Sequence, residues 1–293
     1  MKMYRNKKII ITFLAPTIIG LTLFVYYPLV KSILNSFYEW TLFSSDKKWV
    51  GLGNFIEIIT GENIGLILKN NTLYAVISVI CQVLIAMVLA ACLEEAFMRK
   101  FQPFFRSILF MPSLISMTVV AILWKNIFNP NTGILNSLIH AIGFTDVTPQ
   151  WIGDAHMAIF CCIFISQWQG MGYCILLDLI GIQKIPSALY DAAKIDGAGA
   201  LKRFFYVTVP MAKESMLVTS LIIVIGSFKL FTEIQVLTGG GPGRATEVLA
   251  TAMYRAAFTN DKMGIGSAYA VIIFVITMTL SLIQMKVSKT GKE

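Results

Sequence analysis

Charged residues are scarce in this chain: they make up 14% of its 293 residues, against 56% that are hydrophobic. About a quarter of the residues of a typical soluble domain are charged, so this composition excludes an ordinary soluble domain and predicts several membrane spans. The net charge of +8 does not indicate nucleic-acid binding, because the basic residues are scattered between apolar stretches instead of lining a polar domain. We therefore expect membrane lipid, and no nucleic acid, around the chain.

Residues and motifs that carry chemistry are also few. The two histidines, His140 and His156, are far apart in the sequence and have no ligand-like neighbours. All five cysteines fall inside apolar stretches without the spacing of a metal site. No HExxH, GxSxG or Walker A motif occurs. We predict no catalytic residue, no metal and no cofactor on this chain, so an intramembrane enzyme is unsupported and energy must come from a partner or an ion gradient.

Apolar sequence, by contrast, is abundant. A helix needs ~20 mostly apolar residues to cross a bilayer, and six stretches qualify: 9–30, 71–95, 107–128, 156–180, 213–237 and 267–286. The first is long for a signal peptide and no clear cleavage site follows it, so we expect a retained span. No repeat or linker divides the chain. We predict an all-α polytopic membrane protein with six transmembrane helices in a single domain, residues 1–293.

The distribution of lysine and arginine predicts the orientation of these helices. With the N-terminus inside, 15 of the 24 basic residues fall on the inner side, and the outer loops hold fewer. Basic residues near the ends of spans favour the cytoplasm. Both termini and the loop at 186–210 are therefore expected to be cytoplasmic.

The loop at 186–210 has the pattern of a short helix, a turn and a return helix. Pro186 suits the first turn of a helix, because its missing N–H would have no partner there. The apolar residues that follow it share one helical face. Gly197 and Gly199 can adopt the positive φ that ends a helix. An amphipathic helix of this kind could also lie on the lipid surface.

The same loop resembles the EAA loop of permease subunits of ATP-binding-cassette importers. The matching residues are Tyr190, Asp191, Ala192, Ala193, Asp196 and Gly197, followed by Pro210. In that family the loop forms a coupling helix that docks into a cytoplasmic ATPase, so the resemblance implies this role for the six loop residues and a type I importer fold. Asp191 departs from the usual glutamate and keeps the carboxylate on a shorter side chain.

A second resemblance lies after the fifth apolar stretch. The run from Leu237 to Gly243 is similar to the Leu-Thr-x-Gly-Gly-Pro signature of carbohydrate-uptake permeases. No Gly-Lys-Ser or Gly-Lys-Thr follows, which argues against a phosphate-binding loop. In those relatives the loop touches the external binding protein, which implies that contact for Gly240, Gly241 and Pro242.

Polar residues in the fourth stretch suggest a substrate path. Ser166, Gln169, Gly170 and Tyr173 follow helical spacing and share a face. Such residues either line a path or hold helices together, and spacing alone does not decide between these. The segment also resembles the Trp-x-Gly-x-x-Tyr segment of maltose-type permeases, which implies substrate contacts.

The fifth stretch carries Ser227, Lys229 and Glu233. Opposite charges at i, i+4 inside a span must pair or face an aqueous cavity. A structural ion pair is the alternative to a substrate site, especially for Glu233. By resemblance, Ser227 and Lys229 line the translocation path, where the lysine could bind hydroxyls or an acidic sugar.

Together these features predict the pore subunit of an importer for an oligosaccharide or other carbohydrate, in the bacterial cell membrane. The resemblance implies a second, homologous permease subunit, two cytoplasmic ATPase subunits that hold ATP and magnesium, and an extracellular solute-binding protein. Two alternatives remain at this point. One is a permease of the same superfamily for a glycerol phosphodiester or a polyol, and the other is an ion-coupled secondary transporter.

Overall fold

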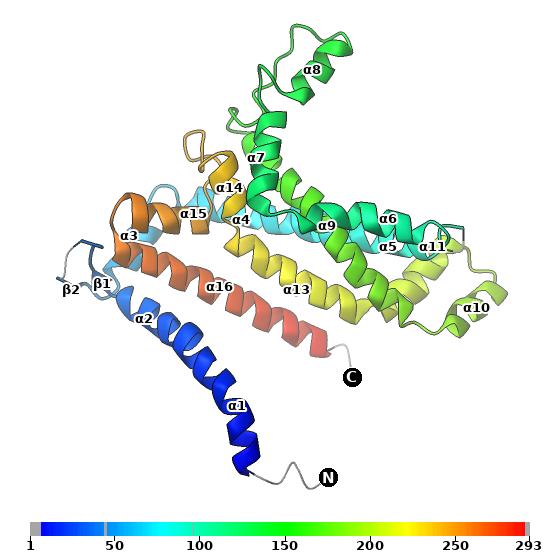
Figure 1. Cartoon of the computed structure of the whole chain (residues 1–293), viewed down its shortest axis with the longest axis horizontal. Helices are drawn as coiled ribbons and strands as arrows, with labels where there is room; N and C mark the ends of the chain where they lie inside the picture. The colour runs from blue at the N-terminus through cyan, green and yellow to red at the C-terminus, as the bar shows by residue number, and fades with distance from the viewer. Residues whose placement is uncertain (1–6, 44–45, 96, 291–293) are drawn as a thin grey trace. The chain divides into compact units, whose positions relative to one another are not determined.

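The structure is a computed structural model that describes residues 7–43, 46–95 and 97–290. Within these ranges the regular secondary structure is helical apart from one short ladder (Figure 1), in which β1 (Tyr38–Glu39) pairs antiparallel with β2 (Lys48–Trp49). The prediction of an all-α protein is thus confirmed. Lys2, Arg5 and Lys292, which contribute to the orientation argument, lie outside the described residues.

The helical segments vary from single turns to long helices, and those marked η are π or 3₁₀ segments. In chain order they are α1 (Lys7–Leu21), η2 (Thr22–Tyr26), α2 (Tyr27–Asn35), α3 (Gly53–Ile59), α4 (Ile64–Val79), η3 (Ile80–Ile85), α5 (Ala86–Glu94), α6 (Gln102–Phe110), η4 (Met111–Leu114), α7 (Met117–Ile127), α8 (Ile134–Ala141), α9 (Ala158–Gln183), α10 (Ser187–Ile195), α11 (Ala200–Arg203), η5 (Phe204–Thr208), α12 (Val209–Met211), α13 (Lys213–Lys229), α14 (Thr232–Leu237), α15 (Leu249–Tyr254), η6 (Arg255–Thr259) and α16 (Met263–Thr290).

Four of the predicted spans are unbroken helices in the described chain: Ile10–Asn35, Ile64–Glu94, Ala158–Gln183 and Met263–Lys286. Two further pairs are long and apolar enough only when taken together. The first, Gln102–Leu114 with Met117–Ile127, bends by 94°, and the second, Ala200–Met211 with Lys213–Lys229, bends by 70°. Counting each bent pair as one span gives up to six, in line with the six predicted stretches.

The fifth stretch differs from the continuous helix that the spacing presumed, whereas the break in the third stretch is the one that a proline inside a span favours. In the third, α6 ends at Phe110, just before Pro112, which supplies no backbone N–H to continue the ladder. In the fifth, α13 ends at Lys229, because Leu230 has an extended backbone (φ −61°, ψ 134°). The predicted helix 213–237 is therefore two helices, α13 and α14, with a break between them.

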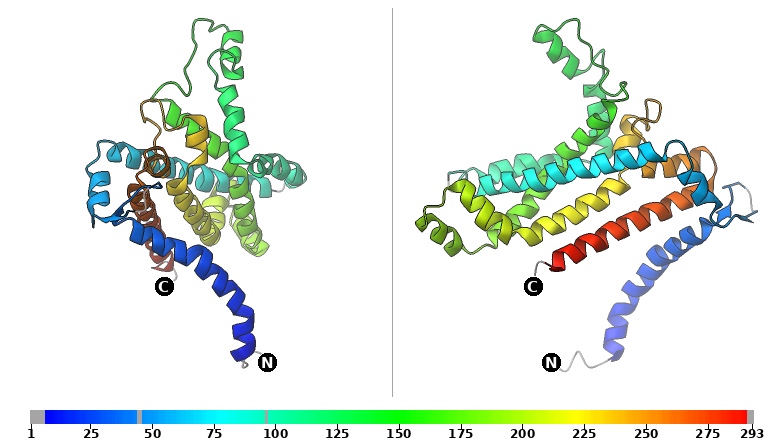
Figure 2. Two further views of the ribbon diagram at one scale, coloured as in Figure 1. Left: turned by 60° about the vertical axis from the view of Figure 1, so that its left-hand side comes forward. Right: turned by 180° about the vertical axis from the view of Figure 1, so that it is seen from behind.

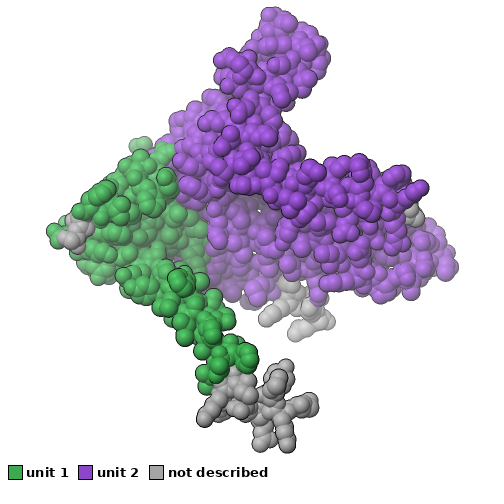
Figure 3. Space-filling model, in the orientation of Figure 1, with its two compact units in different colours: residues 1–64, 252–274 green, residues 65–251, 275–293 purple. Residues whose placement is uncertain are grey.

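The chain divides into two compact units (Figure 3): residues 1–64 with 252–274, and residues 65–251 with 275–293. In the first unit, Ile58, Ala256, Ile265 and Ala268 form a small core. A Cβ at Gly264 would lie 2.0 Å from the carbonyl oxygen of Tyr38, so only glycine allows this close approach of α16. None of the residues in the apolar stretch of the helix Ile10–Asn35 is buried by other parts of the described chain.

The second unit holds the predicted site residues. Its α5 and α9 pack side by side, and α13 packs on α9 (Figure 2). One buried cluster, which includes Ala86, Met87, Ile175 and Leu179, joins α5 to α9. A second cluster, around Ile165 and Ile234, joins α9 to α14. These apolar contacts bury the middle of α9 on several sides.

Candidate functional site

The predicted short helix in the loop at 186–210 is present as α10. Pro186 precedes it as the N-cap residue, with φ −58° and ψ 130°. Gly197 ends it at φ +75°, and the Ala198 N–H returns to the Ala193 carbonyl at 2.8 Å, a helix-ending bond that needs the left-handed glycine. Gly199 has an ordinary φ of −65° and instead begins α11.

The return segment folds back against α10. It is formed by α11, η5 and α12, and the hydroxyls of Tyr190 and Thr208 meet at 3.0 Å to join it to α10. Asp191 and Lys194 of α10 form an exposed ion pair at 3.1 Å, and both residues line the cavity between this loop and α5. The helix has no buried residue, and the Ile195 side chain at its end is 87% exposed. Most of α10 is therefore exposed, apart from the side that carries Tyr190 and Ala193.

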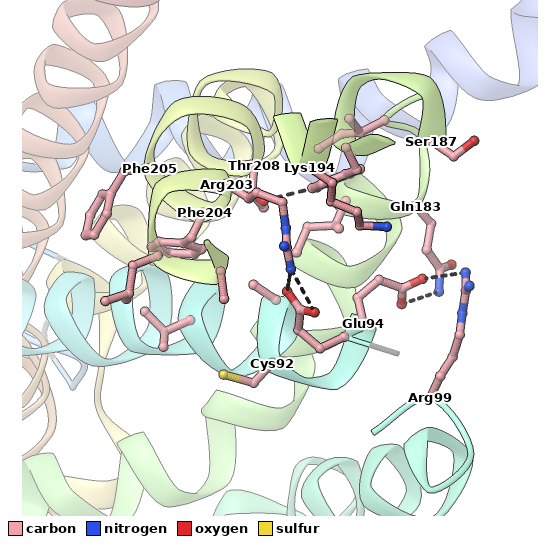
Figure 4. Close-up of a pocket in the computed structure, with 18 of the residues that line it drawn as sticks. Cys92, Glu94, Arg99, Gln183, Ser187, Lys194, Arg203, Phe204, Phe205 and Thr208 are labelled. Carbon is pink, nitrogen blue, oxygen red and sulfur yellow. Dashed lines mark hydrogen bonds and ion pairs between the residues drawn. The ribbon is translucent and has the colours of Figure 1, made fainter. Parts of the chain in front are cut away.

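A cavity of about 1010 Å³ separates this loop from the end of α5 (Figure 4). Arg203 of α11 crosses to Glu95, with hydrogen bonds of 2.9 and 3.2 Å to the two carboxylate oxygens. The neighbouring Glu94 accepts from Arg99 at 3.3 Å and from Gln183 at 3.3 Å. Figure 4 shows Arg203 reaching across the cavity while Glu94 faces Gln183 and Arg99.

The Arg203–Glu95 pair was not anticipated from the sequence. Its members are separated by 108 positions, and neither belongs to a motif. The only signal was opposite charge on two segments expected on the same side of the membrane.

Two of the predicted substrate residues, Ser166 and Glu233, lie together in a buried polar cluster. Glu233 Oε1 accepts hydrogen bonds from the Tyr74 hydroxyl and the Ser166 hydroxyl, each at 3.1 Å, and the two hydroxyls also bond to each other. All three residues are buried. Tyr74 was not singled out from the sequence, because a tyrosine in an apolar helix gives no spacing signal.

The ion pair considered for Lys229 and Glu233 does not form in the described chain. The i, i+4 relationship presumed a continuous helix, and the extended backbone at Leu230 removes it. Glu233 faces the hydroxyls of the buried cluster, whereas Lys229 is exposed. Ser227 is buried, donates to the Ile223 carbonyl at 2.8 Å, and accepts the Asn71 side chain on its own carbonyl at 2.9 Å.

The four polar residues of α9 do not share one surface. Ser166 is buried in its cluster, and Gly170 faces Gln82, whose Oε1 would lie 2.7 Å from a Cβ at that glycine. Gln169 donates to the Ile115 carbonyl at 2.7 Å, and Tyr173 is 44% exposed. The interpretation as helix contacts therefore fits Ser166 and Gly170, and an accessible surface is left for Gln169 and Tyr173.

The glycine-rich loop after α14 is tied down at its base. The Thr238 and Thr246 hydroxyls meet at 2.7 Å, and Thr246 also donates to the Gly241 carbonyl at 2.9 Å. Asn70 of α4, only 3% exposed, donates to the Ala245 and Glu247 carbonyls at 2.8 and 2.9 Å. Gly240 adopts φ +88°, which L side chains rarely do. This holds Gly240, Gly241 and Pro242 in a defined loop.

Comparison with known proteins gives consistent matches over the whole chain. Residues 82–289 match the family described as "Binding-protein-dependent transport system inner membrane component". The chain is 48% identical to "Probable ABC transporter permease protein YurN" of Bacillus subtilis over 289 residues, which cover 99% of both proteins. It is 30% identical to the "Arabinooligosaccharides transport system permease protein AraP" of the same organism, over 99% of this chain and 91% of AraP.

A solved structure has the same fold. It is the "Crystal structure of bacterial alginate ABC transporter in complex with alginate pentasaccharide-bound periplasmic protein", and one of its chains matches with a TM-score of 0.87 at 20% identity. The match covers 100% of this chain and 99% of that chain.

Proposed function

Because this chain belongs to the family of binding-protein-dependent transport system inner membrane components, it is a multi-pass permease subunit of an ATP-binding-cassette transporter, and we propose that it forms half of a pore that imports an oligosaccharide. Arabinooligosaccharides are named for one relative, and an alginate pentasaccharide accompanies the structural neighbour. These names support a carbohydrate substrate. Family membership removes the ion-coupled alternative.

The observation that carries the mechanism is the exposed helix α10, a projection with no buried residue. In our proposal it lies in the cytoplasm and docks into an ATPase subunit through Tyr190, Asp191, Ala192, Ala193, Asp196 and Gly197. ATP and magnesium are held between two such ATPase subunits. Their closure moves α10 and switches the helical bundle between inward-facing and outward-facing states.

Two further partners complete the proposed assembly. A second, homologous permease supplies the other half of the pore. An extracellular solute-binding protein delivers the sugar to the loop at Gly240, Gly241 and Pro242, which the hydroxyls and amides at its base hold in shape.

The seven proposed substrate residues divide into two groups by their surroundings. Gln169, Tyr173 and Lys229 retain accessible surface and are the proposed direct contacts with sugar hydroxyls. The other four are engaged within the protein and are proposed to shape the path: Ser166, Gly170, Ser227 and Glu233.

The docking role of α10 is tested by reversing one of its charges. Asp191→Lys should abolish co-purification of the ATPase subunits, because a lysine would sit where the partner surface meets a carboxylate. Asp146→Lys is the matched control, since Asp146 is also an exposed aspartate but lies in another loop. Full retention of the ATPase by Asp191→Lys would refute the docking role.

The substrate class is tested by transport. The complete complex, reconstituted in liposomes with its binding protein, should accumulate an oligosaccharide from a labelled panel and should do so only with ATP. Uptake of a glycerol phosphodiester or a polyol, with no oligosaccharide transported, would refute the carbohydrate assignment and leave the permease class intact.

A further inference from the structure

The Arg203–Glu95 pair is the strongest polar connection between the loop at 186–210 and the long helix that ends at Glu94. Both carboxylate oxygens of Glu95 accept from Arg203. The same guanidinium donates to the Ala198 carbonyl at 3.4 Å, in the turn that follows α10. One side chain thus holds the turn of the loop and the end of α5 together.

This pair differs from an ordinary surface ion pair in its geometry. The Arg203 side chain is 16% exposed and that of Glu95 is 40% exposed, whereas Arg99, which pairs with Glu94 nearby, is 70% exposed. Both bonds to Glu95 come from one nitrogen, Nη2, while Nη1 donates to the Ala198 carbonyl, so the guanidinium is held at two points. Hydrogen bonds between charged partners are stronger than those between neutral groups. In the Arg99–Glu94 pair a single bond joins an exposed arginine to a glutamate that is 18% exposed, so that arginine is constrained much less than Arg203.

The helix that receives this contact runs without interruption from Ile64 to Glu94. At its other end, Asn70 holds the glycine-rich loop and Tyr74 bonds to Ser166 and Glu233. At about 1.5 Å per residue, the 70–95 segment is roughly 37 Å long. We call this helix, α4–η3–α5, the rod. Glu95 directly follows its last residue, and the groups that hold the glycine-rich loop lie at its other end.

We propose that Arg203 and Glu95 are positioning residues that couple movement of α10 to the α4–η3–α5 rod, and through it to the loop at Gly240–Pro242. This inference rests on the proposed docking of an ATPase on α10. The ion pair does not form the docking surface; it converts displacement of that surface into displacement of the rod.

The test uses the complete transporter in liposomes and compares Arg203→Gln, Glu95→Gln and the exchange Glu95→Arg with Arg203→Glu. Three quantities are measured: ATPase co-purification, basal ATP hydrolysis, and stimulation of hydrolysis by the sugar-loaded binding protein. Each single variant should retain ATPase co-purification and basal ATP hydrolysis, and the stimulation by the binding protein should fall at least tenfold. The exchange, which restores the pair with opposite polarity, should recover most of it.

Arg99→Gln is the matched control, because it removes the neighbouring arginine–glutamate pair without touching the loop. It should behave like the unmodified protein. If Arg203→Gln keeps the same stimulation as Arg99→Gln, the coupling role is refuted. It is also refuted if Arg203→Gln releases the ATPase, since the pair would then shape the docking surface, or if the exchange does not recover stimulation.

Failure of this inference is distinguishable from failure of the proposed function. If Asp191→Lys releases the ATPase while Arg203→Gln has no effect, docking on α10 stands and only the ion-pair role falls. If Asp191→Lys retains the ATPase, the docking proposal itself falls, and the coupling role falls with it.

Discussion

Gly172→Ala should push α6 and α9 apart, because the added methyl group has no space between the two helices. A Cβ at this position would lie 1.8 Å from the carbonyl oxygen of Leu109 and 2.5 Å from its carbonyl carbon. Non-bonded heavy atoms normally stay about 3.5 Å apart, so the two helices would have to separate by roughly 1.7 Å. The obstacle is backbone, which cannot rotate away as a side chain does.

Gly172→Ala should therefore be destabilising despite the better helix propensity of alanine. Overpacking of this kind costs about 1–3 kcal/mol, and exchanging glycine for alanine inside a helix returns about 0.5–1 kcal/mol. Because the clash involves backbone atoms, we expect the upper part of the range and a net loss of roughly 1–2 kcal/mol.

Gly226→Ala is the matched control, because it makes the same substitution inside α13 where a Cβ would meet nothing within 4 Å. Only the propensity gain applies there. In detergent, the apparent melting temperature of the purified complex should fall for Gly172→Ala and hold or rise for Gly226→Ala. An unchanged or raised value for Gly172→Ala would refute the close approach of α6 and α9.

Three other variants test separate features. Asn70→Ala removes two donors from buried loop carbonyls at a cost of about 1–3 kcal/mol, so protease cleavage in the glycine-rich loop should accelerate. Asn126→Ala should not change it, because the Asn126 side-chain amide donates to the Ile122 carbonyl one turn earlier in its own helix. Lys229→Ala should lower sugar uptake without changing assembly of the complex, whereas Lys125→Ala should leave uptake unchanged. Unchanged uptake kinetics in Lys229→Ala would show that Lys229 does not line the path. The Asp154 carboxylate accepts two backbone N–H groups before α9, which lowers its pKa; its stabilising effect is therefore present above the ordinary aspartate pKa of about 3.9 and is lost as the pH falls through the lowered value. Asp154→Asn should flatten this acid sensitivity in thermal melts, and an identical pH profile would contradict the assignment.

Much of the loop at 186–210 was readable from local sequence. Pro186 before the helix and Gly197 after it act through backbone conformation within a few residues, so helix and turn followed from the chain itself. Gly199 was misjudged as a second left-handed position, because a glycine permits positive φ without requiring it.

The candidate path was predicted less well. Leu230 belongs to a residue type that favours helices, so nothing local marked the break after α13 or the loss of the Lys229–Glu233 pairing. Helical spacing put Ser166 and Tyr173 on one face of α9. Several helices pack around α9, however, and different neighbours contact different residues of that face. Partners for Ser166, Gly170 and Glu233 come from elsewhere in the chain.

By itself the sequence determined that this protein is a membrane protein and that it has six apolar stretches. It also determined that a short helix lies between the fourth and the fifth stretch. These properties depend on hydrophobicity and backbone preference over a few neighbouring residues. Only the tertiary structure decided that the fifth stretch breaks at Leu230, that Glu233 bonds to Tyr74 and Ser166, and that Arg203 bonds to Glu95. Those contacts join residues far apart in the chain, and their energies arise only once folding has brought the helices together.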